Sequence, residues 1–426
     1  MNMAGRLAGR AKPYHALVAG ALLTALGQGM YSAASIIYFT RLLGLSVGQV
    51  GLALSAAGAM GFLATVPLGR LVDEIGARRT AVVLQIAKAV LVAALAVIQS
   101  FWLFLVAAAL LGAATRGGQV AWQALVADVV GPQQRVRVQA LTRSAFNGGV
   151  SVGVLAAAPV IVLTDRGPFV AMLLGVALCY LLVSQVTARL PVPHQAVRKD
   201  LDVRPARPGT AFVLLGFVTG FLGLHISILE IAIPLWVLQQ ADVPESAVSL
   251  LLFVNTVLVI ALQVPLSRSS KSVRGSTITL AVSGAVVAAS CVVFALTHGL
   301  GGWSAIALLV SATVLLTLGE VLQSAASWGL GFELSPVGGR GGHLGAFALG
   351  SALQDIVGPG LVTFVLIQHP PEGWWLLAVA LVAGGLVAIP LARRAQRHLI
   401  AHTAATAQTQ TVGSAEQSSL KGGTTP

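Results

Sequence analysis

The segment GRLVDEIGARR, residues Gly69–Arg79, is a charged, glycine-punctuated stretch between two long apolar runs, and we interpret it as a loop. Part of it recurs in the second half of the chain. Residues 66–70 read VPLGR, and residues 264–268 read VPLSR. Internal repetition in a chain of apolar runs is typical of a membrane protein built from two related halves.

Composition supports a membrane location. The 426 residues are 56% hydrophobic and only 9% charged, whereas a soluble domain has about 25% charged residues. The 47 glycines suit helices that pack closely in lipid. Cys179 and Cys291 both fall inside apolar runs, which argues against a disulfide scaffold. The net charge of +12 comes without a basic patch interleaved with aromatic residues, so we expect no nucleic-acid partner.

The apolar runs predict the architecture. A hydrocarbon core about 30 Å thick needs about 20 apolar residues of helix. Suitable runs lie near residues 15–39, 47–68, 80–100, 102–126, 140–163, 168–188, 211–238, 247–267, 276–297, 303–327, 343–367 and 373–392. We therefore predict an all-α integral membrane protein with 12 transmembrane helices. Its parts are a six-helix bundle at 1–190, a proline-rich linker at 191–209, a second six-helix bundle at 210–395 and a disordered cytoplasmic tail at 396–426.

The basic residues predict the orientation. If the N-terminus is cytoplasmic, only Arg41 and Arg166 of the 26 Lys and Arg residues lie in outside loops. Lys88 and Arg116 lie within spans, and the remainder are on the cytoplasmic side. The positive-inside rule thus predicts that both termini are cytoplasmic in a multi-pass protein of the cell membrane.

Further matches relate the two halves. The matched segments occur in the same order in both halves, as expected for a duplication of six helices. They are Arg116 and Gln119 with Glu320 and Gln323, Asp128 and Arg135 with Glu333 and Arg340, and 144–147 (SAFN) with 351–354 (SALQ).

At this point the chain resembles the major facilitator superfamily, over residues 14 to about 395. The superfamily has a G-x-L-x-D-x-x-G-R-[RK] signature between its second and third helices. Gly69, Asp73 and Gly76 fall in place here, as do Leu71 and Arg79, while the arginine expected after Gly76 is shifted to Arg78. The resemblance implies two pseudo-symmetric bundles. It also implies that Asp73 sits against a facing helix end and pairs with Arg70, Arg78 or Arg79 to latch the cytoplasmic side.

A second family feature is an acid and an arginine separated by six intervening residues. It occurs twice, as Asp128 with Arg135 and as Glu333 with Arg340. Partial desolvation where helices leave the membrane strengthens such a pair, so we assign both pairs to the cytoplasmic gate. Solvated loop charge is the alternative.

Other family patterns are incomplete. Residues 116–119 (RGGQ) resemble the R-x-x-Q-G pattern that the family ties to proton coupling, but Val120 replaces the final glycine. The antiporter pattern G-x-x-x-G-P is half present at 149–153, and 358–360 (GPG) supplies a similar kink later in the chain.

Charged side chains within the spans indicate the functional cavity. Each costs a few kcal/mol at the bilayer centre, so such groups face the bundle interior. Lys88 either faces the cavity or extends its stem to the inner surface. Arg116 lies deeper and needs an anion. Glu320 is either its direct partner or a carboxylate that takes up protons, and we prefer Asp355 for the proton or substrate site. The coupling and cavity residues that we predict are Arg116, Glu320, Asp355, Glu230, His225, Gln119, Gln323, Asn147, Gln354 and Gln28.

Several of these residues have a second interpretation. Glu230 precedes Pro234 near the outer end of its span and suits an outer gate, and a lone helical His225 is usually a packing residue. Interhelical hydrogen bonds explain polar spans as well as a cavity does. Asn and Gln are scarce in the spans, which favours an apolar cargo.

No GxxxxGK[ST], HExxH, CxxC or GxSxG element occurs, so we expect neither an enzyme nor a metal site nor a bound cofactor. We predict a monomeric secondary carrier driven by the proton gradient, whose partners are a small molecule, protons and the bilayer. Proton-coupled export of a hydrophobic or amphipathic molecule is the leading hypothesis. Proton-coupled uptake of a sugar or other organic solute is the alternative, and a receptor or assembly role comes third.

Overall fold

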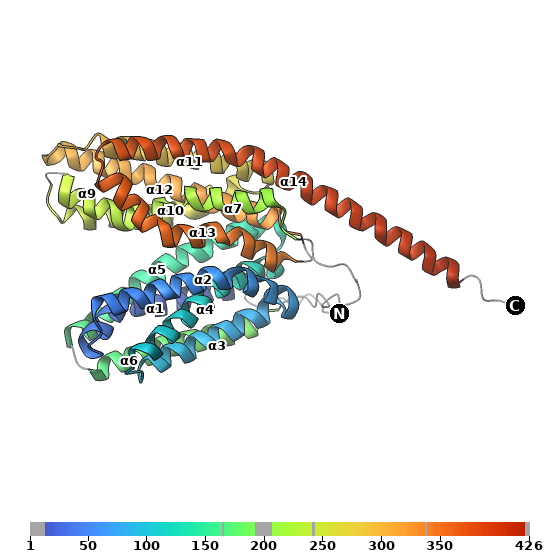
Figure 1. Ribbon diagram of the computed structural model, residues 1–426, viewed down its shortest axis with the longest axis horizontal. Coiled ribbons are helices and arrows are strands. Elements are labelled where there is room, and N and C mark those ends of the chain that lie inside the picture. The colour runs from blue at the N-terminus through green and yellow to red at the C-terminus, as the bar shows by residue number, and fades with distance from the viewer. Residues whose placement is uncertain (1–12, 164–165, 192–206, 241–242, 337–338, 422–426) are drawn as a thin grey trace, which may run out of the picture.

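The computed structural model describes residues 13–163, 166–191, 207–240, 243–336 and 339–421. The first twelve residues, 192–206 of the predicted linker and 422–426 of the predicted tail lie outside this described part. Its elements are helices that form two groups lying side by side, α1 to α6 and α7 to α14 (Figure 1).

The first group has six long helices. They are α1 (Pro13–Ile37), continued by the π-helical η2 (Tyr38–Leu42), then α2 (Val47–Ile75), α3 (Ala77–Leu95), α4 (Phe101–Val129), α5 (Arg135–Leu163) and α6 (Arg166–Ala188), with a short 3-10 turn η3 (Pro132–Gln134) before α5. Helix α1 packs on α5 and α6, α2 packs on α4, and α3 packs on α4 and α6. Apolar side chains such as Phe39, Phe104 and Phe169 fill the interior.

The second group repeats this plan with interruptions. Its helices are α7 (Thr210–Leu222), α8 (His225–Ser227), η4 (Ile228–Ala232), α9 (Ile233–Gln240), α10 (Ala247–Leu266), η5 (Ser267–Ser269), α11 (Val273–Ala295), α12 (Gly302–Glu333), α13 (Arg340–Val362), η6 (Thr363–Ile367) and α14 (Glu372–Lys421). Elements α7, α8, η4 and α9 follow one another as a single broken span. Trp236, Phe294 and Trp374 stack in the core of this bundle.

Each predicted apolar run lies in a long helix or in a series of consecutive helices. Ten of the described helical stretches are long and apolar enough to cross a membrane. Helices α3 and α5 are not among them. Each carries three cations, among them Lys88 and Arg143, and such residues lower the hydropathy of a helix. Two bundles of six spans remain the arrangement because α3 and α5 pack within the first bundle.

The loop interpretation of residues 69–79 is wrong. Helix α2 continues to Ile75, and α3 begins at Ala77. Only Gly76 leaves the helical conformation, with φ of +92°, a value that L side chains rarely adopt. The intervening Leu, Val, Glu and Ile residues are compatible with a helix, so one glycine makes the turn.

The structure also differs from the predicted disorder of the tail, because α14 continues as a helix to Lys421 and extends beyond the rest of the molecule (Figure 1). The sequence from residue 396 to 421 contains alanines and glutamines and no proline, so it suits a helix better than its polarity suggests.

Contacts between the bundles come mainly from α2 with α13, α5 with α10, α4 with α13 and α5 with α12. The α2–α3 turn, the ends of α4 and α6, and the beginnings of α7 and α13 lie at the same end of the molecule, as the contacts below establish. We call this end the latch end.

Candidate functional site

At the latch end, Asp73 near the end of α2 caps the facing helix α13. Its two carboxylate oxygens accept hydrogen bonds from the backbone N–H groups of Gly341, at 2.6 Å, and Gly342, at 2.7 Å. The first N–H groups of a helix have no partner within the helix and carry partial positive charge, so a carboxylate there is favoured. Asp73 therefore joins the two bundles through a helix end, as the family resemblance implies.

The expected ion pairs of Asp73 with neighbouring arginines are wrong. Among the described residues, Arg70, Arg78 and Arg79 have no carboxylate oxygen within 4.0 Å. Arg78 donates instead to the backbone carbonyl of Leu190, beyond the end of α6, at 3.1 Å. The physical reason is that two backbone donors already satisfy the Asp73 carboxylate.

Glycines let α2 and α13 approach closely beside this cap. A Cβ placed on Gly69 would lie 2.5 Å from the carbonyl oxygen of Gly341, and one on Gly345 would lie 2.8 Å from that of Thr65. Distances under 3.0 Å require a neighbour to shift. The predicted Gly69 is thus placed at the seam between bundles, where only a hydrogen fits.

A second link at the latch end joins α4 to α13. Arg340 is 7% exposed and its Nη1 lies 3.3 Å from Oδ1 of Asp128. Pairing within the acid-six-arginine motifs is therefore wrong. Arg135 donates two hydrogen bonds to the carbonyl of Ala127, and Glu333 is exposed, with no ion pair among the described residues. The arginine of one motif pairs with the acid of the other because the two bundles face each other there.

A cavity of about 380 Å³ lies between the bundles. Its α3 lining residues, Ala81, Gln85 and Lys88, come from the first three turns of that helix, so the cavity extends from the membrane centre toward the latch end. The wall combines the aromatic rings of Trp122, Trp328, Phe146 and Phe347 with charged and amide side chains.

One ion pair crosses the cavity. Arg116 of α4 pairs with Asp355 of α13, and both line the wall. Arg116 also donates to Oε1 of Gln119 at 3.3 Å. The side chains are 24% and 40% exposed, respectively, so the pair is within reach of water or of a solute that enters the cavity. An ion pair with this access can be opened by a competing ligand.

A second, looser contact brings Arg143 of α5 toward Glu320 of α12. Nη2 of Arg143 lies 3.8 Å from Oε1 of Glu320. Glu320 is 6% exposed and accepts from Nδ2 of Asn255 at 2.9 Å. His225 is also buried, and its Nδ1 lies 3.2 Å from the carbonyl oxygen of Leu222, whichever tautomer is present. The partner of Glu320 is therefore Arg143, not Arg116.

Comparison with known families follows this geometry. A sequence profile described as Major Facilitator Superfamily matches residues 17–359. The chain belongs to the Major Facilitator Superfamily. No curated protein sequence matches it.

Solved structures of superfamily transporters share the fold. The transporter FucP in its outward conformation aligns with a TM-score of 0.70 at 15% identity, covering 90% of this chain and 98% of its own. A bacterial homologue of the iron transporter ferroportin, outward-facing, gives 0.69 at 15% identity, covering 91% and 100%. The human organic anion transporter MFSD10 gives 0.63 at 16% identity, covering 89% and 99%. At these identities the likeness establishes the fold alone.

Most of the predicted cavity residues meet in this superfamily cavity. Those that line it are Arg116, Asp355, His225, Gln119, Gln323, Gln354 and Gln28. Three do not line it. Glu320 lies behind Arg143, Asn147 lies on α5 outside the lining, and Glu230 is exposed on η4. The predicted gate residues, by contrast, gather at the latch end, where Gly76 forms the turn between α2 and α3.

Sequence reasoning missed part of the wall. Arg143 was among the basic residues assigned to the cytoplasmic side, although Gln139, Arg143 and Phe146 recur at the spacing of one helix face. The expected scarcity of polar groups is wrong for the cavity itself. Seven glutamines line it, at positions 28, 85, 119, 123, 139, 323 and 354. They are a small fraction of the chain, but they come from six helices and all line the same cavity.

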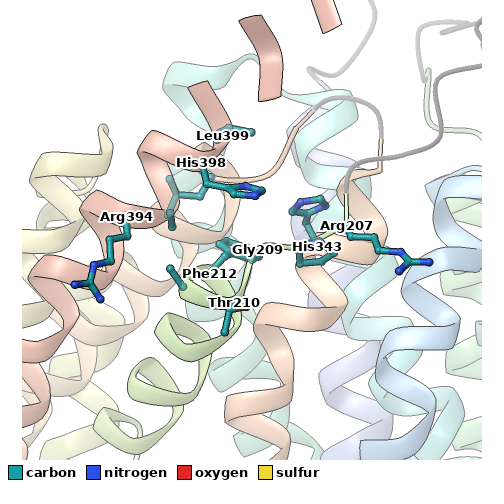
Figure 2. Close-up of a pocket in the computed structure, with 12 residues that line it drawn as sticks. Arg207, Gly209, Thr210, Phe212, His343, Arg394, His398 and Leu399 are labelled. Carbon is teal, nitrogen blue, oxygen red and sulfur yellow. The ribbon is translucent and has the colours of Figure 1, made fainter. Parts of the chain in front are cut away.

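A second pocket, of about 490 Å³, lies at the latch end where the chain before α7, the start of α13 and α14 meet. Figure 2 shows Arg207 and Arg394 on opposite sides of it, with their guanidinium groups directed away from each other. His343 and His398 also line it, and none of the predicted cavity or gate residues does. This pocket is separate from the cavity between the bundles.

Proposed function

We propose that this protein is a proton-coupled exporter of a small amphipathic organic molecule, which works by alternating access of the central cavity. The observation that carries the proposal is the Arg116–Asp355 pair, because it links the two bundles across the cavity that holds the cargo. We further propose a monomer in the cell membrane, with the latch end and both termini on the cytoplasmic side, and with no nucleic-acid partner.

The wall supports an amphipathic cargo. Trp122, Trp328 and Phe146 supply apolar ring faces, while seven glutamines and the charged side chains supply polar contacts. Drug-sized ligands occupy cavities of about 300–1,000 Å³, so a volume of about 380 Å³ suits a small member of this class.

The ion pair supports exchange of cargo against protons. The bundles can rock apart at this point only if Arg116 and Asp355 separate. There are two ways to separate them. A proton neutralises Asp355, or a polar group of the cargo binds Arg116 in place of Asp355. If either ligand alone separates the pair, the carrier changes between its inward-facing and outward-facing states with cargo bound in one direction and with a proton bound in the other. An inward proton gradient then drives cargo outward.

Uptake together with protons is the second candidate. The seven glutamines favour it because amides suit the hydroxyl groups of a polar solute. The two candidates differ in direction, since uptake moves cargo and protons the same way.

Everted membrane vesicles test the proposal. Their interior is acidified, and accumulation of three dyes is followed: N-phenyl-1-naphthylamine (neutral), fluorescein (anionic) and ethidium (cationic). We expect at least one dye to accumulate, to be released by an uncoupler, and to fail to accumulate with Asp355→Asn. Accumulation that is insensitive to the uncoupler would overturn proton coupling. Gradient-driven accumulation in right-side-out vesicles alone would establish uptake instead of export.

A further inference from the structure

Lys88 on α3 is a buried cation, and no carboxylate in the part of the chain that the structure describes pairs with it. It is 5% exposed, and among the described residues no carboxylate oxygen lies within 4.0 Å of its ammonium group. Its ammonium group lies against the ring of Tyr180, whose centroid is 4.4 Å from Nζ. A buried charge is costly unless it is paired, so Lys88 needs a partner that the described residues do not supply.

The site of Lys88 is the wall of the central cavity. Lys88 lines it together with Gln85, one helical turn earlier on α3. Nε2 of Gln85 donates to Oγ1 of Thr24 at 3.4 Å, whereas its Oε1 is buried and has no hydrogen-bond partner among the described residues. The alternative, an extended stem that reaches water at the membrane surface, does not fit a side chain that is 95% buried and packed on Tyr180.

The other charges of the cavity are matched. Arg116 is paired with Asp355, and Arg143 lies against Glu320. The charged side chains that line the cavity, taken together with Glu320 beside Arg143, leave one positive charge, that of Lys88, when His225 is neutral. Glu230 is not part of this count because it does not line the cavity. A cargo with one negative charge completes the balance.

We propose that the cargo is an amphipathic organic monoanion, such as an aromatic carboxylate or sulfonate, whose acidic group binds Lys88. A hydrogen-bond donor on the cargo meets Oε1 of Gln85, and its apolar part lies among Trp122, Phe146 and Trp328. This inference rests on the proposed export function and names its cargo. An anionic group is also the natural competitor of Asp355 for Arg116, and an inside-negative membrane potential favours its outward movement.

Two probes that share one ring skeleton isolate the charge. They are 1-anilinonaphthalene-8-sulfonate, an anion, and N-phenyl-1-naphthylamine, which lacks the sulfonate. Binding to the full-length protein in phosphatidylcholine nanodiscs is measured by fluorescence and calorimetry, with empty nanodiscs subtracted. We expect Lys88→Gln to weaken binding of the anion by at least about tenfold and to leave the neutral probe unchanged.

Two variants serve as controls. Lys88→Arg keeps the charge and should retain binding of the anion within about threefold of the parent protein. Lys271→Gln makes the same chemical change at an exposed lysine outside the cavity and should have no effect. Unchanged binding of the neutral probe by Lys88→Gln also verifies that the cavity has folded.

Three outcomes would overturn the inference: no saturable binding of the anion by the parent protein, equal affinity in Lys88→Gln, or parallel loss of both probes. Failure of the export proposal is distinguishable. If the anion binds through Lys88 but vesicles show no uncoupler-sensitive transport, the charge assignment stands and export fails. If vesicles transport the neutral dye equally well with Lys88→Gln, export stands and the anion assignment fails.

Discussion

The two layers of contact between the bundles have opposite polarity. At the latch end the N-terminal bundle supplies acids, Asp73 and Asp128, and the C-terminal bundle supplies donors, the start of α13 and Arg340. In the cavity the N-terminal bundle supplies the cations and the C-terminal bundle supplies Asp355 and Glu320.

The layers differ in their partners as well. Asp73 is held by two backbone N–H groups of a helix that packs closely on α2, whereas Asp355 is held by a side chain and is 40% exposed. Backbone donors keep their place and charge, while a side-chain partner can be displaced. We infer that the latch sets which state is stable, and that the cavity pair responds to ligands.

The largest effect is expected in the cavity layer. Asp355→Asn leaves the charge of Arg116 without its partner, and Arg116→Gln leaves that of Asp355, so each should reduce gradient-driven transport by at least about tenfold. The double variant removes both charges. In a double-mutant cycle on thermal unfolding, we expect a coupling energy of about 0.5–3 kcal/mol. Additive changes in stability would show that the pair does not hold the bundles together.

In the latch layer, Asp73→Ala removes two charge-assisted hydrogen bonds from the start of α13. We expect the ratio of closed to open molecules to fall by at least about tenfold, since even one such bond contributes about 1.5–3 kcal/mol and about 1.4 kcal/mol corresponds to a factor of ten. The separation of the bundles is measured by electron paramagnetic resonance between spin labels at Glu74→Cys and Glu333→Cys. Cys179 and Cys291 are replaced by alanine in this protein. A distance distribution identical to that of the parent protein would contradict the role of Asp73.

A smaller effect separates the two latch arginines. Arg340→Gln breaks a link between bundles and should broaden the same spin-label distances, with a change in population of about three- to fivefold. Arg135→Gln removes only hydrogen bonds to Ala127 within its own bundle and serves as the matched control. Equal effects of the two substitutions would support ion pairs within each motif, Asp128 with Arg135 and Glu333 with Arg340.

The smallest effect is expected at Glu333. Its carboxylate is exposed and forms no ion pair among the described residues, so Glu333→Gln should change transport and spin-label distances by less than about twofold. A larger loss in the vesicle assay would show that this acid finds a partner in another state of the transport cycle.

The sequence predicted the spans, because twenty apolar residues in a row have few alternatives to a membrane helix. It also predicted that Arg116 needs an anion from the opposite half and that Asp73 faces a helix end. It could not predict which acid meets which base. That choice depends on the rotation of each helix about its axis and on how closely the bundles approach. No periodic pattern in the sequence reports either of these.

The errors in the predicted ion pairs and in the cavity wall share this cause. Arg340 pairs with Asp128 because two motif copies face each other, although each copy alone suggests a local pair. Arg143 and the glutamines line one cavity only because six helices are rotated so that these side chains face it. Gly76 was read as part of a loop because local charge was weighed above the helix propensity of its neighbours.

The single-residue turn at Gly76 has a mechanical consequence. Only Gly76 connects Ile75 to Ala77, so α2 and α3 cannot slide past each other as helices joined by a long loop can. The movements of α2, which carries Asp73, and α3, which carries Lys88, are thus coupled. When the Asp73 carboxylate moves away from α13, the Lys88 ammonium group in the cavity moves as well. Opening of the latch end is then coupled to a displacement of Lys88, the residue that we propose binds the cargo.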